Sequence, residues 1–205
     1  MCGRFRLSRP EKVAESFDVE ADSSWEARSN IAPSQNVTVI RQDALKPVRF
    51  ASQLRWGLIP SWAKDARIGF KAINARSETV ATTPAFREAF RQRHCLIPAD
   101  AFYEWKAEGK TKTPYCFTMT DDSLFAFAGL WERWKRLDGT QVESCTILTT
   151  EPNALCAEVH NRMPVILPPT AYNLWLDPQR AQVKELQSLL RTYPAELMRS
   201  CSASL

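Results

Sequence analysis

Most apolar residues of this chain fall in short runs rich in β-forming side chains, separated by polar or turn-forming residues. Such runs are typical of strands, and Gly109 and Asp138-Gly139 mark turns between several of them. The predicted strands cover residues 2–7, 37–41, 48–56, 95–98, 101–106, 115–120, 124–134, 144–150 and 164–167. This pattern predicts a protein built mainly from antiparallel β-structure.

Helix signals are fewer and shorter. Ser8-Arg9-Pro10-Glu11 has the form of a capping box with proline in the first turn, and apolar residues follow it. Polar residues 20–36 are expected to form a loop, and Pro60 excludes regular structure from 57–64. Further helices are predicted from Thr83-Pro84 onward, from Pro152 towards His160, at 170–176 and at 178–191.

Length and pattern together define the expected fold. A chain of 205 residues can form one domain with a sizeable core. We expect an α+β fold, mainly antiparallel β, in which the sheet curls towards a barrel and the helices lie at its periphery. Residues 1–193 are expected to form this domain and residues 194–205 a C-terminal tail.

The composition, 44% apolar and 24% charged, is that of an ordinary globular protein. No apolar run approaches the ~20 residues of a membrane span, and charged residues interrupt the N-terminal segment. We therefore expect no membrane contact and a cytoplasmic location. The six cysteines include no CxxC pair and only two histidines accompany them, so neither a metal site nor a cofactor is expected.

The charge distribution is more informative than the net charge of +4. Arginines outnumber lysines, and arginine binds phosphate bidentately and stacks on bases. Seven tryptophans accompany them, a mixture used for binding single-stranded nucleic acid. The alternative is that most of the tryptophans form the core and most of the arginines form a solvated face.

Cys2 is the residue with the most unusual potential reactivity. Initiator methionine is normally removed before a side chain as small as cysteine, which would leave an α-amine and a thiol on adjacent carbons. The amine titrates about two units or more below a lysine amine, and a nearby cation such as Arg4 favours the thiolate. An aldehyde can form an imine with the amine and then a thiazolidine ring with the sulfur. The alternative is a small apolar residue at the start of a strand.

Other polar residues stand in apolar, strand-like surroundings. Glu104 lies among aromatic residues, where burial would raise its pKa and suit it to proton transfer; strand alternation equally permits an outward-facing side chain. His160 lies at a helix-to-strand junction. Asn74 and Arg76 offer an amide and a guanidinium, although the same pattern also suits a simple turn.

Taken in order, these clusters resemble the SOS-response-associated peptidase (SRAP) family. The matching segments are Met1-Cys2-Gly3-Arg4-Phe5, Asn30-Ile31-Ala32-Pro33, Trp56-Gly57-Leu58-Ile59-Pro60, Asn74-Ala75-Arg76-Ser77-Glu78, Ile97-Pro98, Phe102-Tyr103-Glu104-Trp105 and His160-Asn161-Arg162-Met163-Pro164. One departure is Ser29, where an aromatic residue commonly precedes the second motif; it affects the expected local packing and not the chemistry.

The resemblance implies a protein that senses abasic sites in single-stranded DNA and shields them by a covalent thiazolidine crosslink. It implies autocatalytic removal of Met1 and an attack by Cys2 on the ring-opened sugar aldehyde. The implied catalytic residues are Cys2, Asn74, Glu104 and His160, and the implied DNA contacts are Arg4, Trp62, Arg76 and Arg162. Single-strand/double-strand junctions are a further candidate target. We expect a monomer that associates with the nucleoid when bound to DNA.

Two other functions remain open on the residues alone. Glutamine amidotransferases with an N-terminal nucleophile also begin Met-Cys-Gly, and there the thiol attacks an amide with the α-amine as base. Glu104, the His160 motif and the lack of a synthase domain argue against this function. The other alternative is a non-covalent single-strand binder in which Cys2 is incidental.

Overall fold

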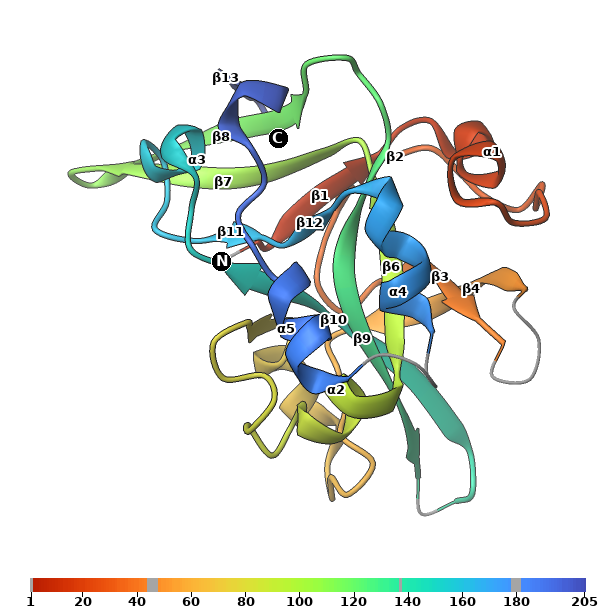
Figure 1. The fold of residues 1–205 in the computed structure, drawn as a ribbon. Helices are drawn as coiled ribbons and strands as arrows, with labels where there is room; N and C mark the ends of the chain where they lie inside the picture. Colours follow the sequence, from red (N-terminus) through yellow and green to blue (C-terminus); the bar gives the residue numbers. More distant parts are fainter. Residues whose placement is uncertain (1, 44–47, 137, 178–181) are drawn as a thin grey trace.

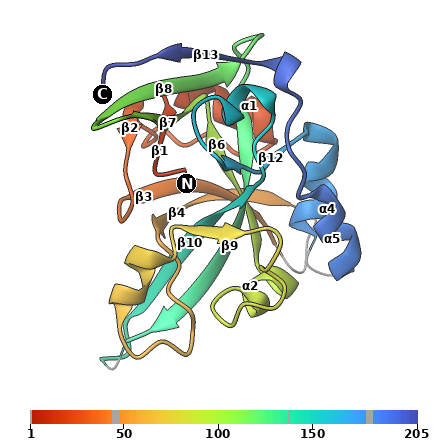
Figure 2. The same ribbon diagram turned by 90° about the vertical axis from the view of Figure 1, so that its left-hand side faces the viewer.

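The computed structural model describes residues 2–43, 48–136, 138–177 and 182–205. Its first layer is an open, fully antiparallel sheet of five strands in the order β13-β8-β7-β1-β2. The bounds are β1 (Arg4–Leu7), β2 (Arg28–Ile31), β7 (Ala101–Glu108), β8 (Thr111–Met119) and β13 (Met198–Ser202). Figures 1 and 2 show β7, β8 and β13 above the second layer.

The second layer is a closed barrel. Its strands are β3 (Asn36–Gln42), β4 (Arg49–Trp56), β6 (His94–Ala99), β9 (Phe125–Lys135) and β10 (Gln141–Thr150). The ring closes because β10 pairs with β9 on one side and, in parallel, with β4 on the other. Short strands extend it: β5 (Asn74–Arg76) and β11 (Met163–Pro164) pair with β10, and β12 (Ile166–Leu167) pairs with β9.

The helices are short and lie around these two layers (Figure 1). The α-helices are α1 (Val13–Phe17), α2 (Arg87–Gln92), α3 (Ala154–Ala157), α4 (Tyr172–Leu176) and α5 (Val183–Leu189). The 3-10 turns are η1 (Pro10–Lys12), η2 (Ala66–Lys71), η3 (Pro169–Ala171) and η4 (Ala195–Leu197). The prediction of a mainly antiparallel, barrel-like α+β fold with peripheral helices is confirmed.

The core lies between the sheet and the barrel. Phe5, Phe102 and Phe117 are register partners across β1, β7 and β8, so their side chains share the inner face of the open sheet. The Phe5 ring lies 5.3 Å from the ring of Trp56 on β4 and 5.6 Å from that of Phe127 on β9. This aromatic contact joins the two layers, and it fixes β1, the strand that follows Cys2.

Several local expectations are wrong. Ser8 does not cap the first helix, because its N–H and its hydroxyl both donate to the buried carboxylate of Asp100. The segment 20–36 contains strand β2, which pairs with β1. The expected tail 194–205 contains strand β13, which pairs with β8. The helix expected at 178–191, by contrast, is confirmed in its described part as α5 (Val183–Leu189), and residues 178–181 lie outside the described part.

Candidate active site

Cys2 lies just before strand β1, and Glu104 lies on the neighbouring strand β7 of the open sheet. The β1–β7 register pairs Arg4 with Tyr103, so its extension brings Gly3 opposite Glu104 and Cys2 one residue further, where the charge of Glu104 acts on the Cys2 thiol. Cys2 has no exposed surface and Glu104 is 3% exposed. Burial and the nearby Glu104 charge both hold the pKa of the Cys2 thiol well above its usual range. In this arrangement Cys2 is a protonated thiol next to a carboxyl group.

Glu104 faces the interior, which resolves the two orientations that strand alternation leaves open. Burial raises its pKa to about 7, because desolvation disfavours the charged carboxylate. A group with this pKa can both accept and donate a proton near neutral pH. The structure therefore places a carboxyl group with a pKa near neutrality close to Cys2, and its role as an acid/base stays a prediction.

His160 is connected to the same region through α3. The backbone N–H of His160 donates to the Cys156 carbonyl at 2.9 Å. The Asn153 side chain caps α3 by accepting from the backbone N–H of Cys156, also at 2.9 Å. Burial raises the pKa of the Cys156 thiol to about 12, and the charge of Glu104 adds to this shift, so Cys156 is near Glu104. Burial lowers the pKa of His160, which favours the neutral imidazole.

Asn74 contributes an amide from β5. Its Nδ2 donates to the carbonyls of Ile73, at 3.1 Å, and Ile147, at 3.5 Å. Its Oδ1 is buried and accepts no hydrogen bond from the described residues. Since buried polar atoms are rarely left unsatisfied, this oxygen is suited to accept from a bound amine or hydroxyl group.

Arg162 has a more structural position than the sequence suggests. Its guanidinium donates to both carboxylate oxygens of Glu78, at 2.6 and 3.0 Å, and to the Thr149 carbonyl at 2.7 Å. Thr149 is the register partner of Arg76 on β5. Arg162 therefore ties the His160 segment to the strands that carry Asn74 and Arg76, and its contact with phosphate stays a prediction.

The other predicted DNA contacts differ in their surroundings. Arg4 donates to Asn30 Oδ1 at 2.8 Å, which joins the first two matching motifs, and Arg76 is exposed. Trp62 is 60% exposed on a separate loop, where its Nε1–H donates to the Pro84 carbonyl at 3.4 Å. The unusual Ser29 is exposed, and its carbonyl accepts from the Tyr103 hydroxyl at 3.0 Å.

The structure also reveals an aromatic residue that sequence reasoning missed. Phe70 in η2 is 59% exposed, and the Arg55 guanidinium lies 5.3 Å from its ring centroid. Trp62 borders a cavity of about 660 Å³ together with residues of η2 and the loop before it, including Lys64, Arg67 and Lys71. An exposed aromatic residue among cations is a signal for base stacking, but the sequence does not show that Phe70 is exposed.

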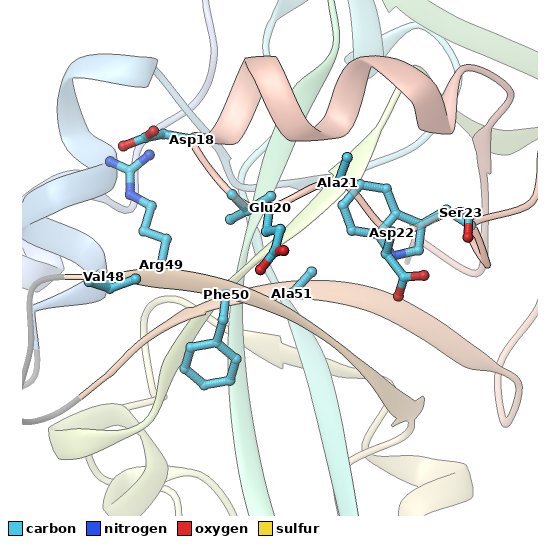
Figure 3. Close-up of a pocket in the computed structure, with 11 residues that line it drawn as sticks. Asp18, Glu20, Ala21, Asp22, Ser23, Val48, Arg49, Phe50 and Ala51 are labelled. Carbon is cyan, nitrogen blue, oxygen red and sulfur yellow. The ribbon is translucent and has the colours of Figure 1, made fainter.

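A second cavity, of about 620 Å³, lies between the segment that follows α1 and strand β4. Figure 3 shows the carboxylates of Asp18, Glu20 and Asp22 with Arg49 at its border, and Phe50 directed away from it. These residues come from elements other than those carrying Cys2, Glu104, Asn74 and His160. The cavity is therefore separate from the candidate site.

Two features are absent from the described residues. Among the described residues, no three or more His, Cys, Asp or Glu side chains lie together in a group that could hold a metal ion. None of their helices is long and apolar enough to cross a membrane.

Comparison with known proteins gives a consistent result. Residues 1–204 match the family described as SOS response associated peptidase (SRAP). Abasic site processing protein YoqW of Bacillus subtilis is 44% identical over 209 residues, which cover 100% of this chain and 92% of the relative. Abasic site processing protein HMCES of Gallus gallus is 30% identical over 181 residues, covering 77% of this chain and 53% of the relative.

Solved structures share the fold. A crystal structure of a Bacteroides thetaiotaomicron protein superimposes with a TM-score of 0.90 at 27% identity, covering 99% of this chain and 92% of the other. A Bordetella bronchiseptica protein gives a TM-score of 0.84 at 30% identity, with full coverage of both chains.

Proposed function

The chain belongs to the SOS response-associated peptidase family, and on that premise we propose that it processes abasic sites in single-stranded DNA. In this proposal Cys2 forms a thiazolidine crosslink with the lesion after Met1 is removed, and the bound protein shields the site as a monomer. The observation that carries the proposal is the buried Cys2 thiol beside Glu104, whose pKa is raised to about 7 by burial.

The proposed reaction uses both nucleophiles of an N-terminal cysteine. The α-amine adds to the aldehyde carbon of the ring-opened sugar, and loss of one water leaves an imine. The thiol then adds to the same carbon, its proton ends on the nitrogen, and the five-membered ring closes. Glu104 donates the proton that converts the departing hydroxyl to water and accepts the thiol proton in the second step.

The remaining groups bind and orient the reactants. The buried Oδ1 of Asn74 accepts a hydrogen bond from the α-amine. Neutral His160 takes the proton of the sugar hydroxyl as the sugar ring opens. Arg4 and Arg76 contact phosphates, Trp62 stacks on a base, and Arg162 positions the His160 segment. The abasic site leaves a gap in the stack, which makes a sharp bend of the strand less costly there.

Removal of Met1 precedes this chemistry in the proposal. It is a hydrolysis of the Met1–Cys2 peptide bond, which consumes one water, and we assign it to Cys2, Glu104 and His160. Without it Cys2 has no free amine and no thiazolidine can form. The glutamine amidotransferase alternative loses support, because the family match spans nearly the whole chain.

The test is a crosslinking assay with Cys2→Ala. Purified protein is incubated with a single-stranded oligonucleotide carrying one abasic site and is then analysed on a denaturing gel and by intact mass. We expect a heat-stable adduct with the wild type, the mass of a chain without Met1, and no adduct with Cys2→Ala. Cys145→Ala, which removes a buried barrel thiol, is the matched control and should crosslink normally.

Two outcomes bear directly on the proposal. A wild-type yield of adduct with Cys2→Ala would overturn the role of Cys2. Equal binding of abasic and intact oligonucleotides by wild type and Cys2→Ala, with no adduct, would instead indicate a non-covalent binder.

A further inference from the structure

A pair of cysteines outside the candidate site lies across two strands of the open sheet. Cys201 on β13 is the direct register partner of Cys116 on β8. Both are free thiols; Cys201 is exposed and Cys116 is 7% exposed. Because the two residues are directly opposite each other on the same side of the sheet, their side chains are neighbours. The pair combines one thiol open to a reagent with a second thiol directly beside it.

The register places this pair at a spacing that a disulfide can bridge. The Ala203 N–H donates to the Pro114 carbonyl at 2.9 Å, and the Thr120 N–H to the Leu197 carbonyl at 3.0 Å. Because hydrogen-bonded pairs alternate along an antiparallel ladder, Cys116 and Cys201 form such a pair, with Cα atoms about 5.5 Å apart. Disulfides most often join Cα atoms about 5.5–6 Å apart.

The position of β13 at the edge of the sheet allows the small shift that brings the two sulfur atoms together. β13 is an edge strand paired only with β8 among the described strands, so it can shift slightly to bring the two sulfurs into bonding distance. The register continues across the sheet from Cys116 to Tyr103 on β7 and to Arg4 on β1. A bridge here would fasten the C-terminal strand to the sheet beside which Cys2 lies.

We propose that Cys116 and Cys201 are an oxidation site, closing a reversible intramolecular disulfide by exchange with a low-molecular-weight disulfide such as oxidised glutathione. The Cys201 thiolate attacks one sulfur of oxidised glutathione, and one glutathione thiolate leaves. The Cys116 thiolate then attacks the Cys201 sulfur of this mixed disulfide, and the second glutathione leaves. Two protein thiols are oxidised and one glutathione disulfide is reduced to two glutathione molecules.

The surroundings favour this pair over the other cysteines. The Arg6 guanidinium opposes the rise that burial causes in the pKa of Cys116, and a cation near a thiol favours the reactive thiolate. Cys95 and Cys145 also lie close together, but both are fully buried in the barrel, and burial raises the pKa of each. Cys95 and Cys145 are therefore an internal comparison: a neighbouring pair of thiols that a dissolved disulfide cannot reach.

The test is oxidation of the reduced full chain with oxidised glutathione, followed by peptide mapping without reduction. We expect one linked peptide pair containing Cys116 and Cys201, reversal by a reducing agent, and a higher melting temperature of the oxidised protein. Cys116→Ser should retain a stable glutathione adduct on Cys201, because the resolving thiol is missing. Cys201→Ser should acquire neither the bridge nor the shift in melting temperature.

Three results would overturn the proposal. They are a wild-type protein that stays reduced, a lasting glutathione adduct on wild-type Cys201, and a dimer linked through Cys201. A linked pair of Cys95 and Cys145 would contradict the argument from access. Cys95→Ser serves as the matched control and should form the Cys116–Cys201 bridge like the wild type.

Discussion

The closed barrel and the open sheet each bury an ionisable side chain, with opposite consequences. His94 on β6 of the barrel packs against Phe90 and Trp175, and burial lowers its pKa to about 4. Glu104 on β7 of the sheet has its pKa raised by burial to about 7. Desolvation favours the neutral form of both groups, so it makes a buried base inert and brings a buried acid to the pH at which it exchanges protons.

The barrel and the open sheet also differ in their strand edges and in the contacts of their ionisable groups. The barrel has no free edge among its five paired strands, and several of its ionisable groups are held by specific partners. Examples are the ion pair of Arg93 with Glu132 at 2.8 Å and the hydrogen bond of His94 Nε2 with the Phe90 carbonyl, also at 2.8 Å. The open sheet carries the poised carboxyl group beside Cys2. The two layers therefore differ in what burial does to an ionisable group: the barrel holds a neutral His94, and the sheet holds a carboxyl group whose pKa is near neutral pH.

The largest effect is expected from removing the poised acid. Glu104→Gln should slow adduct formation by roughly 10²–10⁴-fold, the usual range for loss of a general acid–base group. A gel time course with abasic oligonucleotide measures it. Glu108→Gln, on the exposed part of the same strand, is the matched control and should keep the wild-type rate. Unchanged kinetics of Glu104→Gln would remove this residue from the reaction.

A pH titration of stability tests the two pKa shifts directly. The pKa of His94 is lower in the folded than in the unfolded chain, so His94 costs stability as the pH falls from about 6.5 to about 4, by up to about 3 kcal/mol. The pKa of Glu104 is raised on folding, so Glu104 contributes stability at low pH that is lost as the pH rises from about 4.5 to about 7.

The two contributions can be separated with variants. Urea unfolding at pH 5 and pH 7 should show that His94→Gln shifts the pH dependence relative to the wild type towards greater stability at pH 5. Glu104→Gln should shift it towards greater stability at pH 7. The glutamine amide introduced by His94→Gln can still donate to the Phe90 carbonyl, which limits other losses. Shifts of the same sign in both variants would contradict the comparison.

A smaller effect should follow from crowding the barrel. A Cβ on Gly129 of β9 would lie 2.8 Å from Cys95 Sγ and 3.0 Å from Ile97 Cδ1. Gly129→Ala should therefore lower the free energy of unfolding by about 1–3 kcal/mol, the usual cost of overpacking. Gly139→Ala is not a suitable control, because Gly139 has a φ of +89°, at which any side chain is strained. Ser52→Ala on β4 is a better control. The folded fraction of Gly129→Ala should crosslink at the wild-type rate.

The strands with apolar runs could be predicted from sequence, whereas the polar edge strands could not. Strands β6, β7, β9 and β10 contain runs of β-forming residues that are recognisable locally. Strands β2 and β13 have mostly polar residues, and they are strands because β1 and β8 offer them a free edge. Ser8 likewise follows the capping pattern but bonds to Asp100, a partner far away in the chain.

In the candidate site, too, some properties could be predicted from the sequence and others could not. The chemical types of Cys2, Asn74, Glu104 and His160 are visible in the sequence and led to the family that the comparisons show. Strand alternation could not decide which way Glu104 faces, and no local pattern indicates that Arg162 is held by Glu78 or that Phe70 is exposed. Those properties depend on partners brought together only by folding.

The order of residues alone establishes which reactive groups are present, where most strands lie and to which family the chain belongs. The tertiary structure decided the states of those groups. Burial depends on which layers cover a residue, and only the packing of the sheet on the barrel buries Cys2 and Glu104 and raises both pKa values. The register of β13 on β8, which brings Cys201 to Cys116, is likewise a contact between distant segments.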